Sequence, residues 1–150
     1  MFSETKYYKM AADKGDVESM FNYAYMRQNG DGIPMNKIEA ARYYKMAANK
    51  GNINSMFNYA FMIDSGDGVT VNKKEAVRYY KMAANKGDEY SMFNYATILF
   101  NGNGVPIDKK EAARLYKMAI DKGNIYSMFN YANMLDKGDG IQKNKLKAAF

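Results

Sequence analysis

A 36-residue repeat runs through this chain and constrains its fold more than any other feature. All twelve glycines fall in three positions of the repeat, which begin at Gly15, Gly30 and Gly32 and recur at every 36-residue step. The segment Ser-Met-Phe-Asn-Tyr-Ala recurs with the same spacing, starting at Ser19, Ser55, Ser91 and Ser127. Repeats of this length are typical of solenoids, in which each copy buries its apolar face only against its neighbours.

Each repeat contains two helical segments. Residues 37–50 have alanine and tyrosine at helical spacing, and Gly51 follows as the left-handed residue that commonly ends a helix. A second helix is expected over residues 53–65, ending at Gly66. We call the lysine-rich helix the B helix and the Ser-Met-Phe helix the A helix. Helices of this length, about 20 Å, are too short to be stable alone in water, so stacking must stabilise them. The sequence therefore predicts an all-α fold, an α/α solenoid of about four helix-turn-helix repeats.

A single repeat array is expected over residues 1–150. A leading B helix over residues 1–15 precedes repeats over about 16–51, 52–87, 88–123 and 124–150, the last of them truncated. Met1 aligns with Lys37, and Phe150 falls six residues into a further B helix, so neither end has the complete polar cap that a solenoid needs. The chain could belong to a longer array or be completed by a neighbour. The near identity of the copies admits either recent duplication or a designed consensus.

The composition argues against catalysis. Cysteine and histidine are both absent, which excludes disulfides, thiol nucleophiles, histidine bases and the usual zinc ligands. The Gly-Asp-Gly loops do not fit a calcium site, because aligning Gly32 with the invariant glycine of such a loop places Arg27 and Ile38 at ligand positions. The Gly-x-Gly pairs lack the third glycine and the preceding strand of a dinucleotide loop. We therefore expect a protein that is not an enzyme and has no metal or cofactor.

Location is indicated by what the sequence lacks. No apolar run approaches the length of a bilayer span, and residues 1–6 contain no apolar core of the signal-peptide kind. No Asn-x-Ser/Thr acceptor for glycosylation occurs. With the absence of cysteine, these features favour a cytoplasmic protein without a transmembrane segment.

The repeat resembles a known family. The pattern Ser-x-x-x-Tyr-Ala-x-x-x-x-x-Gly-x-Gly-Ile/Val, followed by Lys/Glu-Ala-x-x-Tyr-Tyr-Lys-Met-Ala-x-x-Lys-Gly, is similar to the Sel-one-like repeat, a relative of the tetratricopeptide repeat. The resemblance covers nearly the whole chain and implies α/α hairpins stacked in a right-handed superhelix. The family usually has alanine at Ser19 and leucine-glycine at Tyr23 and Ala24, exchanges that adjust packing. Family members typically act as adaptors that assemble protein complexes, so the resemblance implies a scaffold or adaptor for protein–protein interaction.

Comparison of the copies separates fixed from varied positions in the A helices. Residues 20–24 recur unchanged, whereas Glu18, Tyr25 and Gln28 change chemistry from copy to copy. At 100° per residue these varied positions share one stripe with positions 21 and 22, opposite a Ser/Met/Tyr/Ala face that is the expected core. In the superhelix that the chain resembles, the A helices line the concave groove, so we expect this stripe to bind a peptide or protein segment. The candidate residues are Glu18, Phe21, Asn22, Tyr25, Gln28, Asn54, Phe57, Asn58, Phe61, Asp64, Tyr90, Phe93, Asn94, Thr97, Phe100, Tyr126, Phe129, Asn130, Asn133 and Asp136.

Within the stripe, aromatic side chains are the expected anchors, because they contribute most to interface energy per residue. The best anchors are Tyr25, Phe61, Tyr90, Phe100 and Tyr126. The invariant Phe and Asn ladders have two interpretations. Each asparagine amide could bind the backbone of a peptide, or each could bond the neighbouring repeat while each phenylalanine packs between A helices.

The B helices carry a basic stripe on the outer, convex face. In one copy it consists of Lys74, Arg78 and Lys81, with Glu75 nearby to dilute the field. A solvated face explains it, and so does an electrostatic footprint for an acidic partner. Nucleic acid is not the expected partner, because no recognised nucleic-acid module accompanies the stripe. The alternative function is a structural or regulatory segment of a longer array or larger assembly, self-associating through its uncapped ends or using its basic face.

Overall fold

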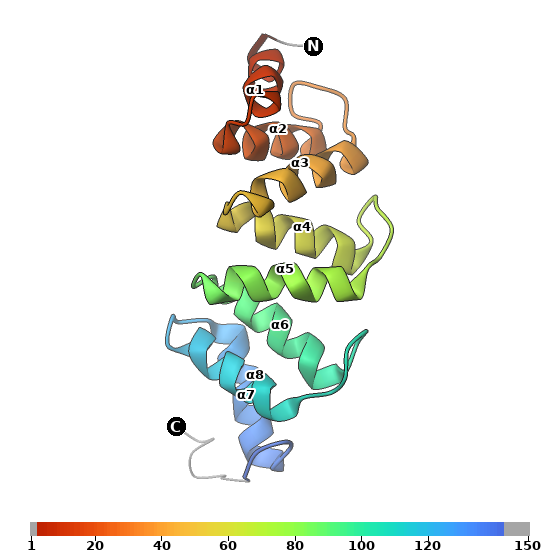
Figure 1. Ribbon diagram of the computed structural model, residues 1–150. Coiled ribbons are helices and arrows are strands. Elements are labelled where there is room, and N and C mark those ends of the chain that lie inside the picture. Colours follow the sequence, from red (N-terminus) through yellow and green to blue (C-terminus); the bar gives the residue numbers. More distant parts are fainter. Residues whose placement is uncertain (1–2, 143–150) are drawn as a thin grey trace. The chain divides into compact units, whose positions relative to one another are not determined.

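The computed structural model describes residues 3–142, and all regular secondary structure in that range is α-helical (Figure 1). The helices are α1 (Ser3–Asp13), α2 (Val17–Asn29), α3 (Lys37–Asn49), α4 (Ile53–Ser65), α5 (Lys73–Asn85), α6 (Glu89–Asn101), α7 (Lys109–Ile120) and α8 (Ile125–Lys137). They form two compact units, an N-terminal unit over Met1–Tyr79 and a C-terminal unit over Tyr80–Phe150, and the boundary between them in the sequence falls within α5. The further B helix expected from residue 145 lies outside the described residues.

Within each unit, most helices pack on the helix that follows them in the sequence. In the N-terminal unit α1 packs on α2, α2 on α3 and α3 on α4, and in the C-terminal unit α6 packs on α7 and α7 on α8. The A helices are α2, α4, α6 and α8, and the B helices are α1, α3, α5 and α7. The predicted all-α repeat fold is confirmed.

The A helices begin at a repeated N-cap. The capping residues are Asp16, Asn52, Asp88 and Asn124. Each accepts a hydrogen bond from the backbone N–H of the repeat serine three residues later, which satisfies one of the free donors of the first turn. Where the cap is aspartate, the serine hydroxyl donates to it as well, as Ser91 does to Asp88 at 2.6 Å. Where the cap is asparagine, the buried hydroxyls of Ser55 and Ser127 have no hydrogen-bond partner within residues 3–142.

The A helices end at glycine. At Gly66 the backbone φ of 73° lies in the left-handed region, where a side chain is strained. A Cβ atom at Gly66 would also lie 2.7 Å from the Cγ2 atom of Val71, because the following loop folds back over the helix end. All twelve glycines have positive φ, so the regular glycine spacing in the sequence marks the ends of helices and the turns of the loops.

Alanine and tyrosine build the core of the N-terminal unit. Ala40, Tyr44 and Ala47 of α3 are completely buried, and the small alanines let neighbouring backbones approach closely. The ring of Tyr43 meets the ring of Tyr23 edge-on, with centroids 4.7 Å apart and an interplanar angle of 76°. Edge-to-face pairs of this kind are favoured by the aromatic quadrupole, so they fix orientation as well as bury area.

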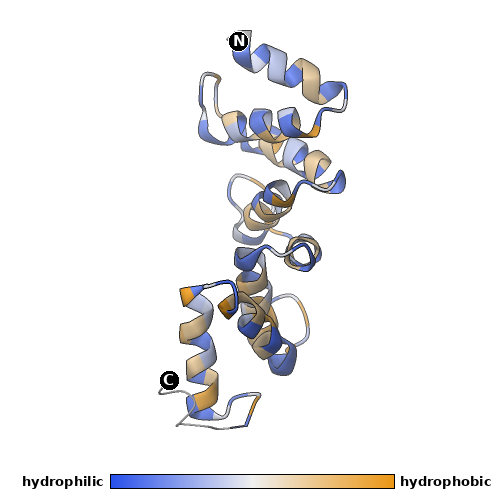
Figure 2. Cartoon of the chain, turned by 90° about the vertical axis from the view of Figure 1, so that its left-hand side faces the viewer, coloured by the Kyte–Doolittle hydropathy of each residue, from blue (hydrophilic) through white to orange (hydrophobic). Residues whose placement is uncertain are grey.

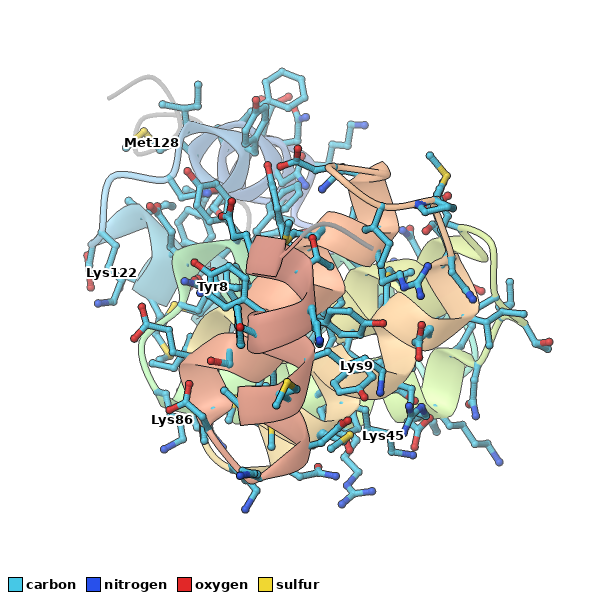
Figure 3. All side chains as sticks on the ribbon, turned by 90° about the horizontal axis from the view of Figure 1, so that it is seen from above. Tyr8, Lys9, Lys45, Lys86, Lys122 and Met128 are labelled. Atoms are coloured by element: carbon cyan, nitrogen blue, oxygen red, sulfur yellow. The ribbon has the colours of Figure 1, made fainter. Side chains whose placement is uncertain are left out.

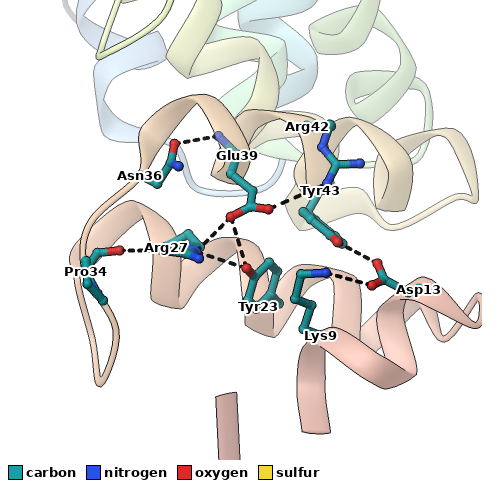
Figure 4. A network of polar contacts seen from close by, with 9 residues as sticks. All are labelled: Lys9, Asp13, Tyr23, Arg27, Pro34, Asn36, Glu39, Arg42 and Tyr43. Carbon is teal, nitrogen blue, oxygen red and sulfur yellow. Dashed lines mark hydrogen bonds and ion pairs between the residues drawn. The ribbon is translucent and has the colours of Figure 1, made fainter. Parts of the chain in front are cut away.

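A polar network ties successive helices of the N-terminal unit together (Figure 4). Glu39 of α3 accepts a hydrogen bond from the hydroxyl of Tyr23 at 3.0 Å and forms an ion pair with the guanidinium of Arg27 at 2.9 Å, both of α2. The Tyr43 hydroxyl donates to Asp13 of α1, beyond the intervening helix. Such bonds between buried or half-buried groups form only in one register, so they align each repeat on the previous one.

One repeated methionine is buried in α6 and exposed in α8. Met92 of α6 packs against Ala84 and Ala119, from the B helices before and after it, and is 2% exposed. Met128 holds the same position in α8, the last described helix, and is 42% exposed and projects outward (Figure 3). Met92 is therefore removed from water by the B helices on both sides of it.

The helices are amphipathic rather than membrane-spanning. Each mixes hydrophilic and hydrophobic residues along its length (Figure 2). Among residues 3–142, no helix combines the length and apolarity needed to cross a bilayer.

Replacing Asn52 by Asp should increase the free energy of unfolding by about 1 kcal/mol. An aspartate at this N-cap would accept bonds from both the N–H and the unpaired hydroxyl of Ser55, as Asp16 does for Ser19. Urea denaturation at neutral pH measures the change. In a Ser55→Ala background the gain should shrink, since only the backbone bond and the helix dipole remain; an equal gain there would contradict the role given to the hydroxyl.

The loss of folding stability at acidic pH should depend on the hydroxyl of Tyr59. Its hydroxyl donates to Glu75 and, with Lys45, lowers the pKa of that carboxyl. Because the folded pKa lies below the unfolded one, this stabilisation is present above the ordinary carboxylate pKa of about 4 and is lost as pH falls through the lowered pKa. Tyr59→Phe should cost about 1 kcal/mol at neutral pH and flatten the loss of stability on acidification.

The matched control is Tyr95→Phe. Tyr95 holds the same repeat position, but Glu111 accepts its side-chain hydrogen bonds from Arg114. These bonds are the largest cause that lowers the pKa of Glu111. The urea midpoints of the wild type and the two variants are measured from neutral pH to about pH 2. The slope of the midpoint against pH should differ from that of the wild type only for Tyr59→Phe. An equal change in the Tyr95 variant would show that the hydroxyl bond is not the cause.

Candidate functional site

The predicted stripe is accessible on the A helices of the N-terminal unit. Tyr25 of α2 is 50% exposed and Phe61 of α4 is 48% exposed. Each lies beside the invariant phenylalanine of its own helix, with ring centroids 6.3 Å apart for Phe21 and Tyr25 and 5.9 Å apart for Phe57 and Phe61. These two aromatic pairs form a surface of rings that is only half covered. Of the other predicted residues in this unit, two are exposed and four are half-buried: Glu18 and Asn54, then Asn22, Gln28, Asn58 and Asp64.

The hydroxyl of Tyr44 explains part of the asparagine ladder. It donates to the Oε1 atom of Gln28 at 2.8 Å, and the side chain of Asn58 also hydrogen-bonds it. Burial raises the pKa of Tyr44 well above its ordinary value. Asn58 therefore satisfies a buried tyrosine of the preceding helix, which supports the packing interpretation of the ladder at this position.

The C-terminal unit contains a cavity on the same stripe. Its volume is about 300 Å³, and it lies between α6 and α8 with a residue of α7 at its base. The lining residues are Thr97, Phe100, Asn101, Tyr116, Asn130, Asn133, Met134, Lys137 and Asp139. Four of these, Thr97, Phe100, Asn130 and Asn133, are among the predicted site residues.

Repeat comparison gives a reason for this cavity. Thr97 and Asn133 hold the positions that Tyr25 and Phe61 hold 72 residues earlier. Two aromatic rings are thereby replaced by two small polar side chains, while the fixed scaffold around them is kept. The varied positions of the stripe thus change the shape of the surface and leave the fold unaltered.

The base of the cavity is the hydroxyl of Tyr116. Asn130 donates to it from Nδ2 at 3.1 Å, and it lies 2.9 Å from the Oγ1 atom of Thr97. The Thr97 hydroxyl donates to the backbone carbonyl of Phe93, so it accepts its bond from Tyr116. Phe100 stands where Gln28 bonds the equivalent tyrosine, and Thr97 supplies the partner that Phe100 cannot. The buried hydroxyl stays satisfied although both varied positions have changed.

Two lysines line or border the cavity, and one of them has an ion pair among the described residues. Lys109 pairs with Asp139 at 2.6 Å, and its Nζ atom lies 5.0 Å from the centroid of the Phe100 ring. Lys137, at the C-terminal end of α8, is exposed and forms no ion pair within residues 3–142.

Phe100 is placed differently from the other predicted anchors. It is half-buried and packs against the core cluster that includes Ala96, Leu99 and Met134, so it forms a wall of the cavity. Three other aromatic residues of the stripe in this unit, Tyr90, Tyr126 and Phe129, are 54%, 59% and 69% exposed. Of the rest, Phe93 and Asn94 are half-buried and Asp136 is exposed.

Five lining residues are not predicted from the sequence: Asn101, Tyr116, Met134, Lys137 and Asp139. For Tyr116, the sequence contained a signal. The tyrosine of Tyr44 and Tyr116 is unchanged between copies, although the neighbouring position changes from Tyr43 to Leu115. A tyrosine kept beside a varied neighbour indicates a required hydroxyl.

The basic stripe of the B helices is exposed, and some of its residues are engaged in ion pairs. Arg114 binds both oxygens of Glu111, and Lys45 pairs with Glu75 at 3.1 Å. Lys86 and Lys122, which follow α5 and α7, are exposed and project outward (Figure 3). The paired carboxylates weaken the field that an acidic partner would meet.

Comparison with known proteins identifies the repeat. The family model described as Sel1 repeat matches residues 5–16, 17–52, 53–88, 89–124 and 125–150. Among proteins of curated function, none matches the chain.

Three solved structures share the fold. A Sel1 repeat protein from Oxalobacter formigenes is 28% identical with a TM-score of 0.86, over 97% of this chain and 58% of that one. The antigen c5321 of uropathogenic Escherichia coli, described as a protective antigen displaying an SLR fold, is 29% identical with a TM-score of 0.91, over 96% of this chain and 31% of that one. Cysteine-rich protein B of Helicobacter pylori is 19% identical with a TM-score of 0.61, over 81% and 87% of the two chains, and shows the fold alone. This chain thus spans less than two thirds of the first two proteins.

Proposed function

The chain belongs to the Sel1 repeat family, and we propose that it is a non-catalytic scaffold that binds a peptide or protein segment along the exposed stripe of its A helices. Sel1 repeats are generally scaffolds for protein interaction, which supports the class of function. The stripe, the segment it binds and the absence of catalysis are proposals for this chain.

The observation that carries the proposal is the half-exposed aromatic surface of the N-terminal unit. Large aromatic side chains lose much of their hydrophobic benefit when left in water, and they are the residues that dominate protein interfaces. Tyr25 and Phe61 are each about half exposed, although their backbone positions are held rigidly by the packed helices α2 and α4. A rigid surface of this kind loses little entropy when a partner binds to it.

The fold does not require these aromatic residues, which supports a binding role. The core face of α2 is formed by Met20, Tyr23 and Ala24, all at most 1% exposed and all repeated without change. The varied residues Tyr25 and Phe61 lie away from this face and can be exchanged without unpacking the repeat. Positions released from packing can set the specificity of binding.

The double substitution Tyr25→Ala and Phe61→Ala should weaken partner binding at least tenfold without changing the helical content or the melting temperature beyond a few degrees. Affinity capture from the source cell with quantitative mass spectrometry, followed by titration of the recovered partner, measures the loss.

The matched control removes exposed apolar side chains outside the stripe. Tyr7 of α1 and Ile38 of α3 are 64% and 71% exposed on B helices of the same unit. Tyr7→Ala with Ile38→Ala should leave partner binding unchanged. If the stripe variant recovers the same partners with the same affinity as the wild type, the stripe is not the binding surface.

A further inference from the structure

The cavity of the C-terminal unit lies where the N-terminal unit has rings of its own. In the N-terminal unit, Tyr25 lies beside Phe21 on the same helix, with centroids 6.3 Å apart. In the C-terminal unit, Phe93 holds the position of Phe21, and Thr97 offers it no ring. Phe93 keeps ring neighbours in Tyr116 and Tyr126, with centroids 6.0 Å and 5.8 Å away, but no ring stands at the position of Tyr25.

The dimensions of the cavity suit one large side chain. A volume of about 300 Å³ is at the small end of the range of ligand pockets, too small for a dinucleotide or a comparable cofactor. Its lining residues include two aromatic residues, Phe100 and Tyr116, and the thioether-bearing Met134. Rings and sulfur make favourable contacts with the face and edge of another aromatic ring, beyond simple burial of area.

The polar groups lie where an aromatic residue in a peptide would present its own polar atoms. Asn130 and Asn133 line the same cavity, and a backbone amide or a phenol could bond their side chains. Lys137, which forms no ion pair among the described residues, stands at the rim. Its charge favours a carboxylate next to the inserted side chain, whereas the charge of Lys109 is already neutralised by Asp139.

We propose that the cavity between α6 and α8 is a recognition pocket for one aromatic side chain of a partner segment, with an acidic residue beside it. The pocket deepens the proposed function, on which it rests, by naming the chemistry that the C-terminal unit selects. The partner supplies the ring that the repeat lacks at Thr97 and Asn133. Ring insertion provides most of the affinity, and the exposed ion pair at Lys137 adds roughly fivefold or less.

The first test uses the full chain and a defined probe. N-acetyl-Phe-Glu-amide is titrated into isotope-labelled protein and followed by NMR, with N-acetyl-Leu-Glu-amide as the aliphatic comparison. The Phe probe should produce saturable shifts centred on Thr97, Asn130 and Met134, with a dissociation constant in the millimolar range expected of a dipeptide. It should bind at least fivefold more tightly than the Leu probe. The absence of saturable shifts at these residues, or equal binding of the two probes, would overturn the pocket.

The second test fills the pocket with the chain's own residues. Thr97→Tyr with Asn133→Phe installs the side chains of Tyr25 and Phe61 at equivalent positions, and should reduce binding of the Phe probe at least tenfold. Circular dichroism establishes that the variant is folded; if it is not, Asn133→Phe alone replaces it. Undiminished binding to a folded, filled variant would also overturn the proposal.

The third test addresses the charge at the rim. Lys137→Ser introduces the residue that stands at the equivalent Ser65. It should weaken the Phe-Glu probe a few-fold and leave N-acetyl-Phe-Gln-amide unaffected. Equal effects on both probes would contradict the acidic neighbour.

The pocket and the proposed function can fail separately. The variant Tyr25→Ala with Phe61→Ala should bind the Phe probe as the wild type does, because its changes lie in the other unit. Loss of the pocket with partner capture intact would overturn only the pocket. If the variant Tyr25→Ala with Phe61→Ala still binds the partner as the wild type does, while the Phe probe binds the pocket, only the proposed function is overturned.

Discussion

Each helix of this protein is sheltered from water by the helices next to it in sequence, and every other property of the structure depends on that arrangement. The helices of 11 to 13 residues are shorter than isolated helices need to be stable in water. Their stability comes from alanine-lined contacts, from edge-on tyrosine pairs such as Tyr23 with Tyr43, and from hydrogen bonds that reach the previous repeat. Met92 of α6, with a B helix on either side, is 2% exposed, whereas Met128 of α8, the last described helix, is 42% exposed.

Because the core face holds the repeats together, the opposite face of each A helix is free to vary. The buried hydroxyls of Tyr44 and Tyr116 illustrate it. Gln28 supplies the partner in one repeat, and Thr97 supplies it in the other, where Phe100 replaces the glutamine. The requirement to satisfy a buried hydroxyl is kept, while the surface above it changes from a ring-covered ridge to a cavity. Recognition can therefore diversify along the array at little cost in stability.

The helices and their core face could be predicted from the sequence because they are determined locally. The helix over residues 53–65 has the predicted bounds, since Gly66 ends it by its own backbone conformation. The cavity could not be predicted in the same way. Thr97 and Asn133 were recognisable as varied positions, but their substitution produces a hollow only because three helices hold the surrounding side chains apart. The half-burial of Phe100 likewise depends on a core cluster from α6, α7 and α8.

The claim that neighbouring repeats bury each other's apolar faces is tested most directly by circular dichroism of a single repeat, residues 37–72. The isolated repeat is measured in water beside the full chain at equal residue concentration. The account predicts that the isolated repeat, which retains α3 and α4 but has neither neighbour, is largely unfolded while the full chain is helical. An isolated repeat as helical per residue as the full chain would contradict it.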